Sequence, residues 1–102
     1  MREVVYEGRH VKVVSADGWE YVTRRRVSGV VVIAALTADG KLILVSQHRK
    51  PVDRTVIELP AGLAGDIEGQ EQEALETAAR RELLEETGYE ADHLECVTAG
   101  PA

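Results

Sequence analysis

The stretch Arg81-Glu82-Leu83-Leu84-Glu85-Glu86-Thr87-Gly88 decides how this sequence is interpreted. It ends a segment of about residues 71–87 that contains neither Gly nor Pro and consists mainly of good helix formers. Acidic residues crowd its first turn, and Gly88 supplies a C-terminal stop. The sequence therefore predicts a helix over about 71–87.

The apolar face of this predicted helix becomes acidic in its second half. At about 100° per residue, one face carries, in order, Leu75, Ala78, Ala79, Glu82 and Glu86. Two like charges four residues apart cost an isolated helix about 0.2–0.5 kcal/mol, and more where water is excluded. A cation is therefore expected there, and carboxylate oxygens suit Mg²⁺ or Mn²⁺. The competing interpretation is a solvated charged face, helped by an i, i+4 pair between Arg81 and Glu85.

The spacing of these residues is similar to the Nudix box. Glu73, seven intervening residues and then Arg81-Glu82-Leu83-x-Glu85-Glu86-x-Gly88-Tyr89 match the latter part of that motif. The family has a glycine six residues before the first glutamate, where this chain has Ile67. Taking Gly62 as that glycine implies about five inserted residues in 63–72, a mild change because loop-closure cost grows only logarithmically.

The resemblance implies an α/β fold, a Nudix-type α/β/α sandwich with a mixed sheet, whose C-terminal part is expected beyond residue 102. It also implies that metal ions are held by carboxylates and one backbone carbonyl, from Ala61, Glu82, Glu85 and Glu86. Arg81 is expected among the catalytic residues. In this family a metal-activated water attacks a phosphorus of a diphosphate, and the proton acceptor in much of the related branch lies beyond this segment.

Two upstream stretches resemble the ADP-ribose pyrophosphatase branch of that family. The first is Gln47-His48-Arg49-Lys50-Pro51 followed by Glu58-Leu59-Pro60-Ala61-Gly62. There Arg49 is expected to grip a diphosphate with its forked guanidinium, the alternative being a strand-end surface charge. The second is Trp19-Glu20-Tyr21-Val22-Thr23-Arg24, where the resemblance implies that Trp19 stacks on adenine and Arg24 contacts the ligand. The alternative for Trp19 is a hairpin or dimer contact.

The first half of the chain predicts antiparallel strands, at about 3–7, 10–15, 19–27, 30–37 and 41–48. Asp17-Gly18 and Asp39-Gly40 are strong hairpin signals. A short strand over 56–62, stopped by proline, and another over 94–98 complete the pattern. We expect one domain over 1–102, with residues 1–28 as an N-terminal antiparallel sheet that contacts a second copy and 29–102 as the core.

Composition narrows the functional classes. The formal net charge of −6 argues against a nucleic-acid surface, which needs a basic face. No apolar run approaches the roughly 18 residues of a membrane span, and no secretory signal is visible, so the cytoplasm is expected. The single cysteine, Cys96, is expected to serve packing in a strand.

These observations together predict a metal-dependent pyrophosphohydrolase that works as a homodimer. Its expected substrate is ADP-ribose, cleaved to AMP and ribose 5-phosphate, or a related nucleoside diphosphate sugar such as GDP-mannose. A Nudix-fold module that binds nucleotide sugars for regulation, and a fragment inactive by itself, stay open as alternatives.

Overall fold

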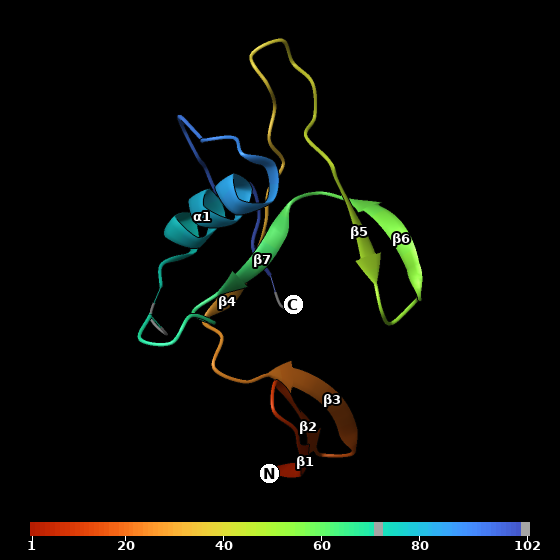
Figure 1. Cartoon of the computed structure of the whole chain (residues 1–102). Coiled ribbons are helices and arrows are strands. Elements are labelled where there is room, and N and C mark those ends of the chain that lie inside the picture. Colours follow the sequence, from red (N-terminus) through yellow and green to blue (C-terminus); the bar gives the residue numbers. More distant parts are fainter. Residues whose placement is uncertain (71–72, 101–102) are drawn as a thin grey trace.

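The computed structural model describes residues 1–70 and 73–100. Within them the chain forms seven strands and one helix, shown in Figure 1. In order these are β1 (Arg2–Glu7), β2 (Val11–Ala16), β3 (Trp19–Arg24), β4 (Gly29–Val32), β5 (Val45–Arg49), β6 (Arg54–Glu58), β7 (Ala61–Ala64) and α1 (Leu75–Thr87). Their pairings are all antiparallel, in the groups β1-β2-β3, β4-β7 and β5-β6. The α/β class and the N-terminal antiparallel sheet are confirmed, and the described residues supply one of the two helical layers of the expected sandwich.

Both Asp-Gly pairs form the turns that the sequence predicts. Asp17 and Gly18 adopt φ values of 49° and 87°, so the β2–β3 connection has the left-handed backbone that a two-residue hairpin needs. Gly40 has φ 82°, and the chain on either side of it pairs through a bridge between Leu36 and Leu42. The second hairpin is therefore present, although its two arms are joined by an isolated β-bridge and do not form continuous strands.

The predicted strands 30–37 and 41–48 are wrong in extent, because β4 stops at Val32 and β5 starts only at Val45. Proline explains the end of β4. The N–H of Ile33 donates to the carbonyl of Pro60 at 2.8 Å, but Pro60 has no N–H to return the bond. The same residue divides the predicted strand 56–62 into β6 and β7, which pair with different partners.

The helix confirms the main prediction with a later start. It begins at Leu75, because Ala74 is still extended at φ −68° and ψ 147°; the predicted residues 71–72 lie outside the described part of the chain. Gly88 ends it in the left-handed conformation, φ 79°, and its N–H donates to the carbonyl of Leu84. The strand expected over 94–98 is wrong: this segment has no regular structure, and Cys96 is exposed rather than packed.

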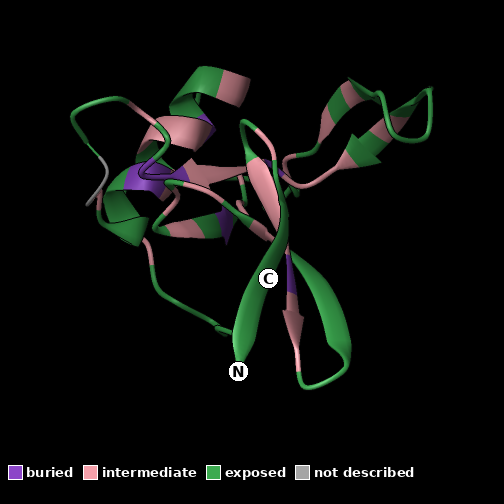
Figure 2. Cartoon of the chain, turned by 90° about the horizontal axis from the view of Figure 1, so that it is seen from below, coloured by how far each residue is buried: buried purple, intermediate pink, exposed green. Residues whose placement is uncertain are grey.

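The core lies where α1 packs on β4 and β7. Its buried residues are small or slender, namely Val31, Ala64 and Ala78, and the two alanines let the helix backbone approach the strands closely. Gly29 contributes in the same way, since a β-carbon there would lie 2.6 Å from Cδ2 of Leu75. Figure 2 shows how few residues are fully buried outside this contact.

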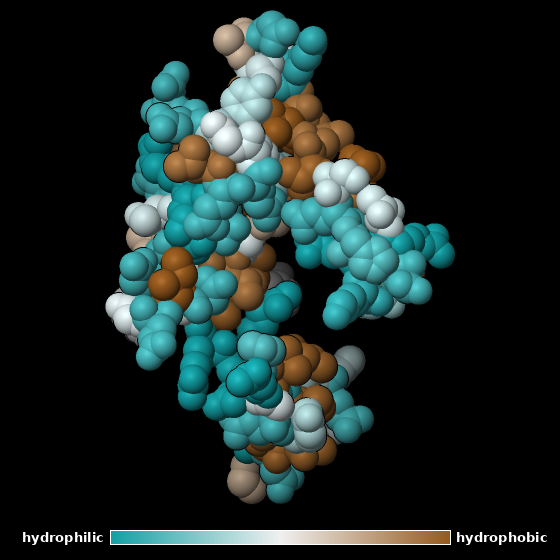
Figure 3. Space-filling model, viewed as in Figure 1, coloured by the Kyte–Doolittle hydropathy of each residue, from teal (hydrophilic) through white to brown (hydrophobic). Residues whose placement is uncertain are grey.

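The described chain is elongated. Its radius of gyration is 15.9 Å, whereas a compact domain of this length has about 13 Å. The sheet of β1, β2 and β3 lies away from α1, beyond the segment 25–28 (Figure 1). Apolar side chains gather on the surface of this sheet, in the lower part of Figure 3, and again in the upper part of that view. The exposed apolar residues on the sheet include Val4, Val5, Tyr6, Trp19 and Val22. No helix among the described residues is long and apolar enough to cross a membrane.

Candidate metal and diphosphate site

Arg81, in the middle of α1, is clamped by Glu73 from the loop before the helix. Its Nε donates to Oε2 of Glu73 at 3.0 Å and its Nη2 donates to Oε1 at 2.9 Å, a two-pronged pair. The Glu73 side chain is only 3% exposed and also accepts a bond from the N–H of Gly65. Arg81, helped by that N–H, lowers the pKa of Glu73, and Glu73 raises the pKa of the guanidinium.

This clamp ties Glu73 to the helix despite the longer loop. The motif spacing indicated Glu73, but the chain differs from the motif shortly before it, where Ile67 replaces the expected glycine. Asp66 lies within 3.7 Å of Arg81, and the carbonyl of Leu63 accepts from Nη2 at 3.1 Å. The lengthened loop therefore stays attached to the helix through one arginine.

The other edge of Arg81 faces the acidic half of α1. Its Nη1 donates to Oε1 of Glu82 at 3.1 Å and to Oε2 of Glu85 at 3.4 Å. The surface pair that the competing interpretation expected between Arg81 and Glu85 is thus present, with Glu85 57% exposed. It is one contact of several, because the same guanidinium reaches Glu82, whose side chain is 12% exposed.

Glu82 is packed against backbone rather than solvated. A β-carbon on Gly62 would lie 2.0 Å from Cδ of Glu82, so the carboxyl occupies the space that a side chain at position 62 would fill. Burial raises the pKa of Glu82, and the nearby charges of Glu85 and Glu86 raise it further, against the opposing charge of Arg81. A largely buried carboxylate with like charges nearby favours a cation beside it.

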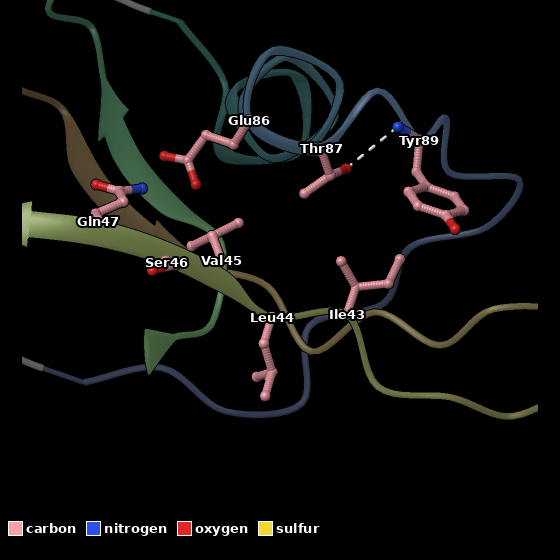
Figure 4. Close-up of a pocket in the computed structure, with 8 residues that line it drawn as sticks. All are labelled: Ile43, Leu44, Val45, Ser46, Gln47, Glu86, Thr87 and Tyr89. Atoms are coloured by element: carbon pink, nitrogen blue, oxygen red, sulfur yellow. Dashed lines mark hydrogen bonds between the residues drawn. The ribbon is translucent and has the colours of Figure 1, made fainter. Parts of the chain in front are cut away.

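The Glu86 side chain points toward β5 (Figure 4). Figure 4 shows its carboxylate reaching across a pocket of about 350 Å³ toward Gln47, and Val45 lines the same pocket. Its Oε2 is buried and has no hydrogen-bond partner among the described residues. A buried oxygen left without a donor is a position where a cation or a ligand donor fits.

The carboxylates do not form a finished metal site in this arrangement. Across residues 1–70 and 73–100, no three His, Cys, Asp or Glu side chains converge closely enough to hold a metal ion. The donor chemistry nevertheless fits a divalent ion: Glu86 has an unsatisfied buried oxygen, and Glu82 is crowded by like charges. Ala61, whose carbonyl was expected to join them, opens β7 immediately before Gly62, the residue against which Glu82 packs.

Arg49 ends β5, and its guanidinium is engaged by Glu58. Its Nε and Nη2 donate to the Glu58 carboxylate at 2.7–3.1 Å. Glu58 raises the pKa of Arg49 through its hydrogen bonds, and the charge of Glu86 on the helix adds to that effect. Arg49 is therefore more than a free strand-end charge, although no sequence signal paired it with Glu58.

Trp19 and Arg24 are not brought to the acidic helix within one chain. They stand at opposite ends of β3, on the N-terminal sheet. Trp19 is 78% exposed, and Arg24 lines a pocket of about 290 Å³ together with Arg2 and Tyr21. The predicted site residues thus fall into two groups, one on α1, β7 and the β5–β6 hairpin and one on the N-terminal sheet (Figure 1).

Comparison with known proteins gives a family match over most of the chain. The sequence profile of the NUDIX domain matches residues 25–101. The chain is 48% identical over 71 residues to an ADP-ribose pyrophosphatase of Bacillus subtilis, covering 70% of this chain and 36% of that protein. It is 34% identical over 100 residues to a methanol dehydrogenase activator of Bacillus methanolicus, covering 91% and 51%. An ADP-ribose pyrophosphatase of Saccharomyces cerevisiae is 37% identical over 95 residues, covering 87% and 39%. The chain spans about a third to a half of the length of these relatives.

The Glu73 clamp predicts a loss of stability that depends on pH. Glu73→Gln removes a carboxylate whose pKa is lowered in the folded state, so its contribution is present above the ordinary carboxyl pKa and disappears as pH falls through the folded value. We expect Glu73→Gln to lower the urea midpoint at neutral pH, with the difference closing in acid. Glu76→Gln, which breaks a single exposed contact to Arg80, is the matched control and should change little.

Glu82 predicts the opposite sign. Its pKa is raised in the folded state, so the ionised carboxylate opposes folding above that pKa and the penalty vanishes below the unfolded value. Glu82→Gln should therefore raise the urea midpoint at neutral pH and lose this advantage below about pH 4. A midpoint that fell at neutral pH would show that the bond from Arg81 outweighs the cost of burying this charge.

Proposed function

Because the chain belongs to the NUDIX domain family, we propose that the protein is a metal-dependent pyrophosphohydrolase that cleaves ADP-ribose to AMP and ribose 5-phosphate. The observation that carries the proposal is the acidic half of α1, where Glu82 is dehydrated beside Gly62 and Glu86 holds a buried oxygen without a donor. Similarity to two ADP-ribose pyrophosphatases supports the substrate.

The metal would be Mg²⁺ or Mn²⁺, held by the carboxylates of Glu82, Glu85 and Glu86 and by the carbonyl of Ala61. Such an ion would neutralise the diphosphate and make a water molecule acidic enough to act as nucleophile. Arg81 positions the carboxylates, because one guanidinium already contacts Glu82 and Glu85 and is fixed from behind by Glu73. It also balances their charge.

The substrate would be held at both ends. Arg49 would bind the diphosphate with its planar guanidinium, close to Glu86. Trp19 would stack on the adenine, an interaction worth about 1–3 kcal/mol by comparison with base stacking elsewhere, and Arg24 would contact the same end. With a net charge of −6, the protein depends on these few arginines and the ion to attract a phosphorylated ligand in the cytoplasm.

A homodimer would unite the two groups of site residues. The N-terminal sheet carries Trp19 and Arg24 away from α1 and exposes apolar side chains on its surface. A second copy could cover that surface and place its own sheet near the first copy's helix, giving the closed two-fold arrangement usual for dimers.

Mixed dimers test this arrangement. At a low ADP-ribose concentration we expect Trp19→Ala to lose about tenfold or more in rate, because the stacking contact is worth about 1–3 kcal/mol, and Glu86→Gln to lose orders of magnitude. Refolding the two variants together should restore about a quarter of the original activity for random pairing in a two-fold dimer. Restoration occurs because one mixed site has both an intact tryptophan from one copy and an intact glutamate from the other. A mixture no more active than its components, or a monomer by sedimentation, would reject the shared site.

Hydrolysis itself is tested with a panel of ADP-ribose, GDP-mannose and other nucleoside diphosphate sugars, each with Mg²⁺ or Mn²⁺. We expect AMP from ADP-ribose, and we expect Glu85→Gln and Glu86→Gln to lower the rate by orders of magnitude, roughly as loss of metal-ligand chemistry does. Glu76→Gln is the control. Turnover by both glutamate variants that equals that of the unaltered protein would reject the assignment of the site.

The second candidate is a regulatory module that binds a nucleotide sugar without cleaving it. It is favoured by the similarity to a methanol dehydrogenase activator and by the absence of a converged three-ligand cluster among the described residues. Tight binding of ADP-ribose by calorimetry, with no product from any member of the panel, would select this candidate.

A further inference from the structure

We propose that Glu58 is a positioning residue that orients the Arg49 guanidinium so that its outer edge faces the diphosphate. The inference rests on the proposed function, because it takes a diphosphate as the ligand of Arg49. It assigns a role to an acidic side chain that the metal site does not use.

The β5–β6 hairpin places both residues on one face. Directly opposed residues include Val45 with Glu58 and Arg49 with Arg54, and strand alternation puts Gln47 on the same side. Val45 and Gln47 line the pocket into which Glu86 projects (Figure 4). Arg49 and Glu58 therefore lie on the side of the hairpin that faces α1.

The way Arg49 is held determines which of its donors stay available. A guanidinium carries five N–H groups in a rigid plane. Glu58 accepts from Nε at 3.0 and 3.1 Å and from Nη2 at 2.7 Å, which uses the side edge of the plane. The outer edge, made by Nη1 and the second hydrogen of Nη2, remains for a second anion. A phosphate bound there would meet a guanidinium whose plane is already fixed.

This pair differs from an ordinary surface ion pair in the same chain. Arg80 contacts Glu76 through one nitrogen at 3.3 Å, with Glu76 64% exposed. Arg49 makes three contacts to a carboxylate that is 31% exposed. A long arginine side chain on an exposed hairpin loses rotamer freedom when it is fixed. Because the bonds to Glu58 already fix Arg49, this loss of entropy occurs before a ligand binds.

The test is a double-mutant cycle read by calorimetry with magnesium pyrophosphate, a probe that needs no turnover. We expect Glu58→Gln to weaken binding about tenfold, as loss of one charge-assisted bond does, and Arg49→Ala to weaken it at least as much. The double variant should bind no more weakly than Arg49→Ala, because Glu58 acts through Arg49. Glu76→Gln is the matched control, and thermal denaturation confirms that each variant is folded.

In turnover assays Glu58→Gln should raise the KM for ADP-ribose about tenfold and leave kcat little changed, the pattern of lost uniform binding. Pyrophosphate binding by Glu58→Gln that equals or exceeds that of the unaltered protein would overturn the inference, as would additive losses in the double variant. Absence of turnover with the expected binding cycle would reject the proposed function and leave the inference standing. Unchanged pyrophosphate binding by Glu58→Gln, together with normal turnover of ADP-ribose, would reject the inference and leave the proposed function standing.

Discussion

The Arg81 guanidinium is the contact on which the rest of the site depends. It reaches back to Glu73 and to the carbonyl of Leu63, and forward to Glu82 and Glu85. Removing Arg81 would take this partner from Glu73, Glu82 and Glu85 at once, which costs more than any single bond contributes. The loop, the strand end and the helix are held in one arrangement because a single planar cation satisfies all three.

The sequence alone was enough to predict the parts of the fold that depend on local chemistry. Gly88 ended the helix and Asp17-Gly18 formed a two-residue turn, since both need a left-handed backbone that few residues tolerate. The acidic face of α1 followed from helical periodicity alone. Its link to Glu73 was also visible as spacing, because the lengthened loop lies before Glu73 and leaves the seven residues between Glu73 and Arg81 as in the motif.

Long-range features could not be predicted in the same way. The early end of β4 depends on Pro60 arriving opposite Ile33, a pairing that no local pattern reveals. The hydrogen-bonded pair of Glu58 and Arg49 joins residues nine apart that meet only through the register of the β5–β6 hairpin. The strand expected over 94–98 did not form, and no described strand pairs with this segment. Trp19 and Arg24 were expected at the same ligand as the acidic helix, but β3 carries both of them on the N-terminal sheet, away from α1 (Figure 1).

Gly62 connects the acidic helix to the stability of the strand beneath it. Because Gly62 has no side chain, the Glu82 carboxyl packs directly on its backbone. Gly62 belongs to β7 and pairs with Val31 of β4. When β7 separates from β4 in a local opening event, this packing is lost, so the carboxylate spacing exists only while two four-residue strands stay paired. The position of the Glu82 carboxylate thus lasts only as long as a short strand pair.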